Sequence, residues 1–110
     1  MNYEVVVTNE FIKDSKKLLK KYRSFKEEIS ELIEQLSENP LKGIPLGNNF
    51  YKIRLSISSK GKGKSGGARV ITHFTIIDQI VYLVAVYDKS DQDDVDQERL
   101  STFLEKYKEN

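Results

Sequence analysis

The stretch from Phe50 to Val70 gathers the side chains best suited to binding a polyanion. It contains six basic residues and no acidic one: Lys52, Arg54, Lys60, Lys62, Lys64 and Arg69. The chain of 110 residues has 18 Lys and Arg against 17 Asp and Glu, so without these six, 12 basic residues face 17 acidic ones. Such a concentration of positive charge favours the phosphates of RNA or DNA as a partner. A solvated hairpin with a basic tip is the plainer interpretation, and on charge alone it ranks slightly ahead.

Strand periodicity predicts where the cations of this stretch lie. Residues 50–58 alternate strictly between apolar and polar side chains, which puts Lys52 and Arg54 on the polar face of a half-buried strand. Residues 59–67, rich in Gly and Lys, are expected to form a flexible loop after this strand.

Two further strands are indicated after the Gly-rich loop, over 68–77 and 80–88. A two-residue turn between them would pair Arg69 with Asp88, beside Tyr87 and Lys89, and a longer turn would shift this pairing by one residue. Both strands are apolar on both faces, so we expect them to be central in the sheet and covered on each side.

Helical periodicity completes the fold. The pattern predicts an opening strand over 3–8, helices over 9–22 and 24–37, a loop over 41–49, and a last helix that begins in the acidic run 91–98. Ser24 and Glu27 match a capping box for the second helix. The exposed face of the first helix is basic; we interpret it as a solvated face offset by the acidic second helix, with a second phosphate-binding face as the alternative. The order is β-α-α-β-β-β-α, an α+β fold in which a helical hairpin packs on a mostly antiparallel sheet and the last helix covers an end or the other face.

Composition excludes several classes of site. The chain has no Cys, which excludes disulfides, thiolate nucleophiles and Cys-based zinc sites and suits a reducing cytoplasm. Neither a secretory signal nor an apolar run long enough to span a membrane is present in the sequence, and one domain over residues 1–110 is expected. The G-x-G-x-x-G pattern from Gly61 to Gly66 precedes a strand rather than a helix, so it does not predict a dinucleotide site. His73 stands alone in a strand and is expected to be structural. The acidic run lacks the Gly and the terminal Glu of a calcium loop, so no metal site or cofactor is predicted.

Three strings in this part of the chain, YKIRL, SKGKGKSGGARVI and VYLVAVYDKSD, resemble the RelE/ParE superfamily of toxin–antitoxin toxins, and the HigB-like RelE branch most of all. The resemblance extends to the opening NEFIKDSKKLLKKY and covers most of the chain. It implies a RelE-like fold and a small cytoplasmic RNase that cleaves mRNA in the ribosomal A site. It also implies a cognate antitoxin as partner, next to the ribosome and the mRNA.

The resemblance also implies the chemistry and the residues that perform it. The 2′-OH of the RNA attacks the adjacent phosphate without a metal ion, and Lys and Arg side chains of the sheet supply the proton transfers and the stabilising charge. Carried over by position, the implied catalytic residues are Lys52, Arg54, Arg69 and Lys89. Arg69 is expected to hold the scissile phosphate, Arg54 and Lys52 to stabilise developing charge or relay a proton, and Lys89 to act as general acid or phosphate clamp. The loop cations are expected to bind RNA instead: Lys60, Lys62 and Lys64.

One departure from the family pattern concerns tyrosine. Some members place a Tyr on the last helix near the scissile phosphate, whereas residues 92–96 of this chain contain none. Tyr87 is left as an auxiliary candidate. Other functions also remain open at the level of sequence: a ParE-like poison of DNA gyrase, a nucleic-acid-binding module without chemistry, and a decayed toxin. A salt bridge from Arg69 to Asp88 is the plain structural alternative for that arginine.

Overall fold

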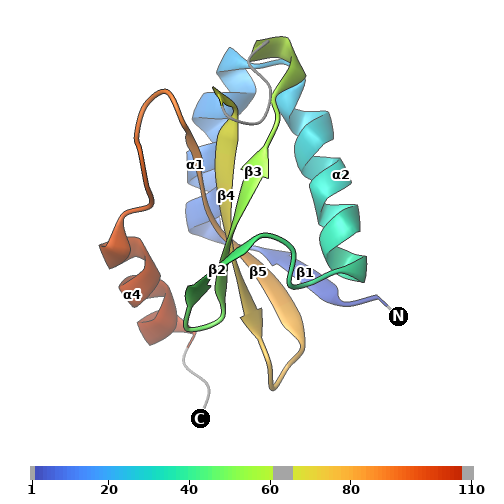
Figure 1. Ribbon diagram of the computed structural model, residues 1–110, viewed down its shortest axis with the longest axis vertical. Helices are drawn as coiled ribbons and strands as arrows, with labels where there is room; N and C mark the ends of the chain where they lie inside the picture. Colours follow the sequence, from blue (N-terminus) through green and yellow to red (C-terminus); the bar gives the residue numbers. More distant parts are fainter. Residues whose placement is uncertain (1, 61–65, 108–110) are drawn as a thin grey trace.

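The computed structural model describes residues 2–60 and 66–107. Within them the chain forms a five-stranded sheet in the order β1-β5-β4-β3-β2, with β1 parallel to β5 and the other neighbours antiparallel (Figure 1). The strands are β1 (Glu4–Val7), β2 (Ile44–Gly47), β3 (Phe50–Leu55), β4 (Ala68–Thr75) and β5 (Ile80–Asp88). The helices are α1 (Asn9–Lys21), α2 (Phe25–Glu38) and α4 (Gln97–Lys106), and a 3-10 turn spans Ser58–Lys60. The predicted α+β class and order of elements are confirmed, with β2 as an additional strand.

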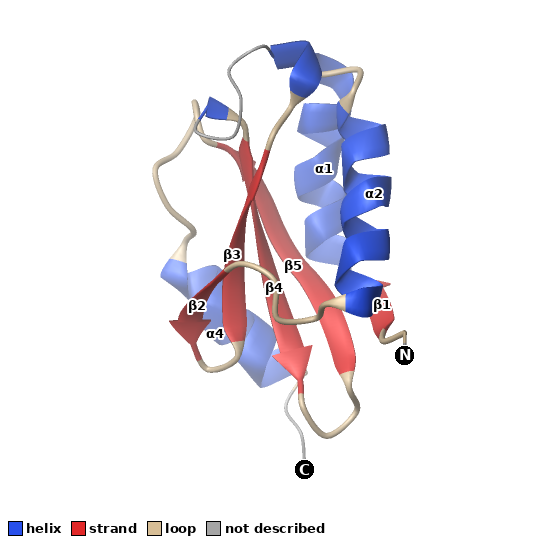
Figure 2. Cartoon of the chain, turned by 45° about the vertical axis from the view of Figure 1, so that its right-hand side comes forward, coloured by secondary structure: helices blue, strands red, loops and turns tan. Residues whose placement is uncertain are grey.

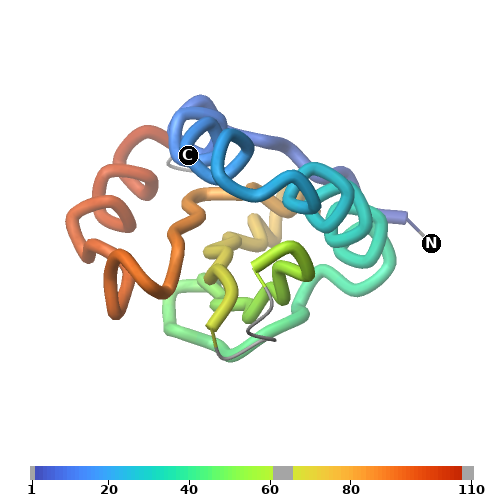
Figure 3. The backbone as a smooth tube through the Cα atoms, turned by 90° about the horizontal axis from the view of Figure 1, so that it is seen from above, coloured from blue at the N-terminus to red at the C-terminus, as the bar shows by residue number. Residues whose placement is uncertain are grey.

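The sheet is the middle layer of three. Helices α1 and α2 lie side by side over one face, and α4 lies over the other (Figures 2 and 3). The larger core joins the two N-terminal helices to the sheet through Phe11, Phe25, Leu32, Leu36, Val70 and Leu83. A second core joins α4 to the opposite face through Phe50, Ile71, Ala85, Tyr87, Leu100 and Phe103. The central strands β4 and β5 are therefore apolar on both sides, as predicted.

Register decides which cations can meet. The β4–β5 turn spans residues 76–79 rather than two residues, and Gln79 adopts a positive φ of 55° in it. A further irregularity between Ile71 and Thr72 shifts the pairing, so Arg69 lies opposite Tyr87 and Ala68 lies opposite Asp88. The pairing is thus one residue away from that of a two-residue turn. Because neighbouring residues of a strand point to opposite faces, Asp88 and Arg69 lie on different sides of the sheet.

Two local predictions were wrong, and a third holds in a narrower form. The loop expected over 41–49 contains β2, an edge strand that pairs with β3 from Ile44 to Gly47. The capping box does not form, since the Ser24 hydroxyl contacts the carboxylate of Glu28 and the hydroxyl of Ser59 instead of capping α2. The last helix begins in the acidic run, as predicted: α4 starts at Gln97, after Asp96, whose carboxylate accepts a hydrogen bond from the backbone N–H of Glu98. The acidic residues before Asp96 therefore belong to a connecting segment.

Membrane insertion finds no support in the helices. Across residues 2–60 and 66–107, none of them combines the length and the apolar composition that a bilayer crossing requires.

Candidate functional site

Two arginines face each other across neighbouring strands. The register pairs Arg54 of β3 with Arg69 of β4, and Arg69 in turn with Tyr87 of β5. Directly opposed residues of an antiparallel pair project to the same face, so these three side chains form a row across the sheet. Ile53 and Leu55 of β3 pack into the core beneath α1 and α2. The row of Arg54, Arg69 and Tyr87 therefore lies on the opposite face, whose other end α4 covers.

Two lysines lie at the same end of this face. Lys52 follows the alternation of β3 and shares the face of Arg54. Lys89 comes directly after β5, and its backbone N–H bonds the carbonyl of Gly67, which places it beside the start of β4. The Nζ of Lys52 is paired with Asp94 and that of Lys89 with Asp93, so the two ammonium groups approach neighbouring residues of one segment. The predicted catalytic cations, Lys52, Arg54, Arg69 and Lys89, are thus brought together by three consecutive strands.

An acidic segment, residues 91–94, closes over these lysines. The Nζ of Lys52 donates to Oδ1 of Asp94 over 3.1 Å, and the Nζ of Lys89 lies 3.6 Å from Oδ1 of Asp93 and donates to its carbonyl. Asp94 also accepts from the backbone N–H of Val95, and this bond, ahead of the Lys52 bond, holds the pKa of Asp94 below its ordinary value. We call Lys52, Arg54, Arg69, Tyr87 and Lys89 the cationic site.

Tyr87 and Arg69 are the buried members of the cationic site. Each is only 6% exposed. The Nη1 of Arg69 donates to the carbonyl of Ala68 over 3.2 Å. The hydroxyl of Tyr87 has no hydrogen-bond partner among the described residues. Burial raises the pKa of Tyr87 above its ordinary value, the negative charge of Asp94 adds to this, and the charge of Arg69 opposes it. The phenol is therefore neutral at physiological pH and available as a donor.

Lys60 is not part of the cationic site. Its side chain is 6% exposed and forms an ion pair with Asp88 on the α1 side of the sheet. Asp88 also accepts from the hydroxyl of Tyr22 over 2.6 Å and from the backbone N–H of Ser90 over 2.9 Å. Burial opposes ionisation of this carboxylate, but its hydrogen bonds from Lys60, Tyr22 and Ser90 outweigh burial and hold the pKa of Asp88 far below its ordinary value. Asp88 is thereby the counter-charge of Lys60 rather than of Arg69. Lys62 and Lys64 lie outside the described residues.

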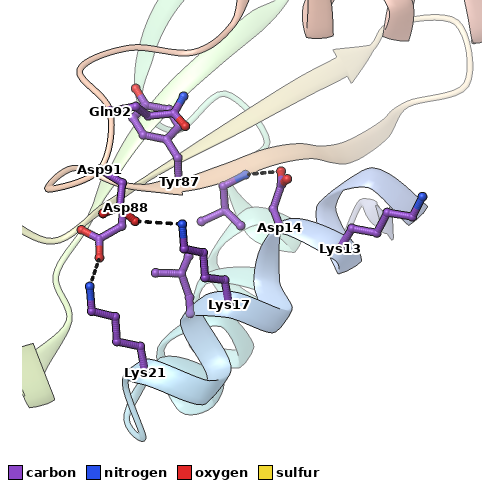
Figure 4. A pocket seen from close by; sticks show the side chains of 10 residues that line it. Lys13, Asp14, Lys17, Lys21, Tyr87, Asp88, Asp91 and Gln92 are labelled. Carbon is purple, nitrogen blue, oxygen red and sulfur yellow. Dashed lines mark hydrogen bonds and ion pairs between the residues drawn. The ribbon is translucent and has the colours of Figure 1, made fainter.

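A separate pocket of about 270 Å³ lies between α1 and the end of β5 (Figure 4). It is lined by three lysines of α1 spaced one helical turn apart, Lys13, Lys17 and Lys21, and by Asp14, Asp88 and Asp91. The Nζ of Lys17 lies 3.3 Å from Asp91, and that of Lys21 lies 3.7 Å from Asp88. Lys17 and Lys21 are therefore offset by acidic residues at the end of β5 and just after it, a pairing that sequence periodicity did not reveal.

Helix α4 is fixed by one partly buried ion pair and an aromatic cluster. Asp14 of α1 accepts two hydrogen bonds from Arg99, at 2.7 and 3.1 Å, and a third from the backbone N–H of Val86. His73 packs against Phe50 and Phe103, with its Nδ1 3.1 Å from the hydroxyl of Thr75. Burial lowers the pKa of His73, which keeps the ring neutral in this apolar setting. The predicted structural role of His73 agrees with this position.

Comparison with known proteins gives two findings. The family model described as RelE toxin of the RelE / RelB toxin–antitoxin system matches residues 8–109. The chain is also similar in structure to the E. coli toxin RelE, solved in the free state as a mutant in which two arginines are replaced by alanine. That similarity has a TM-score of 0.63 at 17% sequence identity and covers 97% of this chain and 99% of the other. The structural likeness supports the fold, and the family model supports membership.

Proposed function

The chain belongs to the RelE toxin family, and from this premise we propose that it is a ribosome-dependent mRNA endoribonuclease that inhibits translation in the cytoplasm. Its family makes it the toxin of a toxin–antitoxin system, with an antitoxin as partner. The proposal adds the mRNA, the ribosome and the chemistry of cleavage to this assignment.

The observation that carries the proposal is the cross-strand pair of Arg54 and Arg69. Like charges directly opposite each other destabilise a sheet, so a protein keeps such a pair where an anion binds between them. A guanidinium binds two phosphate oxygens at once through its fork of N–H donors. Two guanidinium groups from neighbouring strands can therefore hold one phosphodiester from two sides.

The proposed reaction is an internal transfer at phosphorus. The 2′-oxygen of the RNA forms a bond to the adjacent phosphorus, and the bond from phosphorus to the 5′-oxygen of the next nucleotide breaks. The proton of the 2′-OH passes to a base, and a proton from a general acid goes to the leaving 5′-oxygen. The products are a 2′,3′-cyclic phosphate and a free 5′-OH, and no oxidant or reductant is consumed.

The side chains of the cationic site have the charges that this reaction needs. Arg69, rigid in its buried position, orients the scissile phosphate, and Arg54 and Lys52 stabilise the charge that develops on its oxygens. Lys89 donates the proton to the leaving oxygen or clamps the phosphate. Tyr87 adds a neutral hydroxyl donor next to Arg69. Because none of these roles calls for a metal ion, activity is expected to persist when EDTA removes divalent ions from the protein before the assay.

Induction of the chain in cells, followed by primer extension on mRNA, tests the proposal. The wild type should stop growth and produce cuts in phase with codons, and Arg54→Ala and Arg69→Ala should each abolish both effects without loss of folding. Lys16→Ala, which removes an exposed cation from α1, is the matched control and should remain toxic. A DNA-damage response without cuts would indicate a gyrase poison, and absence of any growth effect would indicate a binding module or a decayed toxin.

A further inference from the structure

The acidic segment 91–94 binds lysines from three different elements. Each of its carboxylates is paired with one of them: Asp91 with Lys17 of α1 at 3.3 Å, Asp93 with Lys89 after β5 at 3.6 Å, and Asp94 with Lys52 of β3 at 3.1 Å. Three anions in four residues thus meet three cations that lie far apart in the sequence. Two of these cations, Lys52 and Lys89, belong to the cationic site. The segment therefore places negative charge where the proposed function requires phosphate.

The segment is held in a way that allows it to leave. The side chain of Asp93 is fully exposed, that of Asp94 is largely exposed, and that of Asp91 is 39% exposed. Ion pairs of this kind contribute little to stability and weaken with salt. The next residue, Val95, is buried in the core beneath α4. The buried Val95 can stay in place while the carboxylates before it exchange their partners.

The segment also lies beside Tyr87, a further member of the cationic site. The hydroxyl of Tyr87 is buried and has no hydrogen-bond partner among residues 2–60 and 66–107. Tyr87 and Gln92 of the segment line the same pocket, so the tyrosine lies beside the segment. A buried polar group without a partner is costly, so its presence here calls for an explanation. A ligand oxygen that enters when the segment moves would satisfy it.

We propose that segment 91–94 fills the cationic site in the free protein in place of an RNA strand, and that RNA must displace its carboxylates from Lys52 and Lys89 in order to bind. The inference rests on the proposed function, since it takes RNA as the ligand. It adds segment 91–94 as an internal competitor for the cationic site, and Lys17 as a further RNA contact. Lys17 is released from Asp91 in this exchange. It then contacts a phosphate of the same RNA strand other than the scissile one, where the strand passes α1.

The exchange is electrostatically balanced because it replaces one set of anions by another. Each phosphate that binds recovers the charge pairing that an aspartate gives up, and counterions released from the RNA add to the free energy of binding. Substituting the aspartates by asparagine keeps their size while removing the competing charge. In Asp94→Asn, the side-chain oxygen still accepts from the backbone N–H of Val95. The variant therefore tests the charge of the segment and leaves its main backbone contact in place.

The first test is affinity for RNA at low salt. The probe is a single-stranded RNA of about ten nucleotides with 2′-O-methyl riboses, long enough to fill a site of ordinary size and unable to be cleaved. Binding of the full chain is measured by fluorescence anisotropy for the wild type and for Asp93→Asn with Asp94→Asn. The control carries the same change of charge at the other end of the sheet. It combines Glu4→Gln, at the first residue of β1, with Asp78→Asn, in the β4–β5 turn.

The segment variant is expected to bind about threefold to twentyfold more tightly than the wild type, because two exposed ion pairs no longer have to be broken. The control variant should gain much less. Equal gains in both variants would overturn the competition, since they would report net charge alone, and would leave the proposed function intact. Absence of RNA binding by all three proteins would overturn the inference, whereas the proposed function, which acts on the ribosome, is overturned by the absence of cuts in primer extension.

A second measurement uses the wild type alone. In the free protein the backbone N–H of Asp91 bonds the carbonyl of Asp88 over 2.9 Å, and that of Val95 bonds Asp94 over 2.8 Å. RNA that displaces the segment should speed hydrogen exchange at these two amides, while exchange in the core of β5 slows or stays constant. Unchanged or slower exchange at Asp91 and Val95 on RNA binding would contradict displacement even if the affinities changed as expected.

Discussion

The buried pair of Lys60 and Asp88 yields a prediction about stability that does not depend on function. Asp88→Asn keeps the shape of the side chain but removes its charge. The ammonium of Lys60, 6% exposed, then loses its counter-charge, and the hydrogen bonds from Tyr22 and Ser90 go to a weaker acceptor. Breaking a buried pair from one side costs about 3–5 kcal/mol, a large part of the roughly 5–15 kcal/mol that stabilises a typical domain.

Urea unfolding followed by circular dichroism measures this cost. Asp91→Asn, which removes an exposed partner of Lys17, is the matched control and should change the free energy of unfolding by less than about 1 kcal/mol. Lys60→Met combined with Asp88→Asn should cost less than the sum of the single changes, because the double variant leaves neither charge unpaired. A cost below about 1 kcal/mol for Asp88→Asn would show that the pair is not buried as described here.

The pH dependence follows from the same carboxylate. Its pKa lies far below the ordinary value of 3.8 in the folded protein, because the bonds from Lys60, Tyr22 and Ser90 outweigh the effect of burial. A carboxyl with a depressed folded pKa contributes stability that is fully present above the unfolded pKa and is lost as the pH falls toward the folded one. The wild type should therefore lose stability steeply below about pH 4, and Asp88→Asn should lose much less over the same range. Equal losses in both proteins would contradict the assignment of this shift to Asp88.

Three further outcomes are expected. Asp14→Asn should weaken the bidentate bond to Arg99 and lower the free energy of unfolding by about 2–3 kcal/mol, with faster hydrogen exchange in α4. Gly43→Ala should cost more stability and more RNase activity than Gly47→Ala. Both glycines have positive φ, but a Cβ on Gly43 would lie 2.6 Å from the carbonyl oxygen of Lys52, whereas a Cβ on Gly47 would have open space. RNA binding should weaken with salt with a log–log slope of roughly −4, as about six phosphate contacts on a single strand would give; a flat response would argue against a phosphate surface.

Much of the cationic site was predictable because periodicity and register leave little choice. Alternation in β3 fixed Lys52 and Arg54 on one face, since a slip of one residue would expose Ile53 and bury a charge. The following hairpin then brought Arg69 next to the end of β5 whatever the turn length. The difference of one residue has two sources: Ile76 and Ile77, which look like strand residues, lie exposed in a longer turn, and the irregularity between Ile71 and Thr72 moves the pairing back by one.

Other features depend on contacts that a linear pattern does not contain. Strand β2 holds Gly and Pro and pairs on one side only, so its sequence resembles a loop. The sequence around Lys60 is rich in lysine and predicts an exposed cation. In the structure the ion pair with Asp88, on the α1 side of the sheet, holds the Lys60 side chain in a buried position. The acidic residues before α4 suit a helix N-terminus by composition, and their pairing with lysines arises from the path of the chain between β5 and α4.

The central claim is that Arg54 and Arg69 act together on one phosphate. Single-turnover cleavage of a defined mRNA on purified ribosomes, with Arg54→Ala, Arg69→Ala and the double variant, tests it most directly. If both guanidinium groups hold the same phosphodiester, either substitution should remove most of the rate, and the double variant should be little slower than the worse single one. Losses that multiply in the double variant would contradict the claim, because they would mean that the two arginines act at separate places on the RNA.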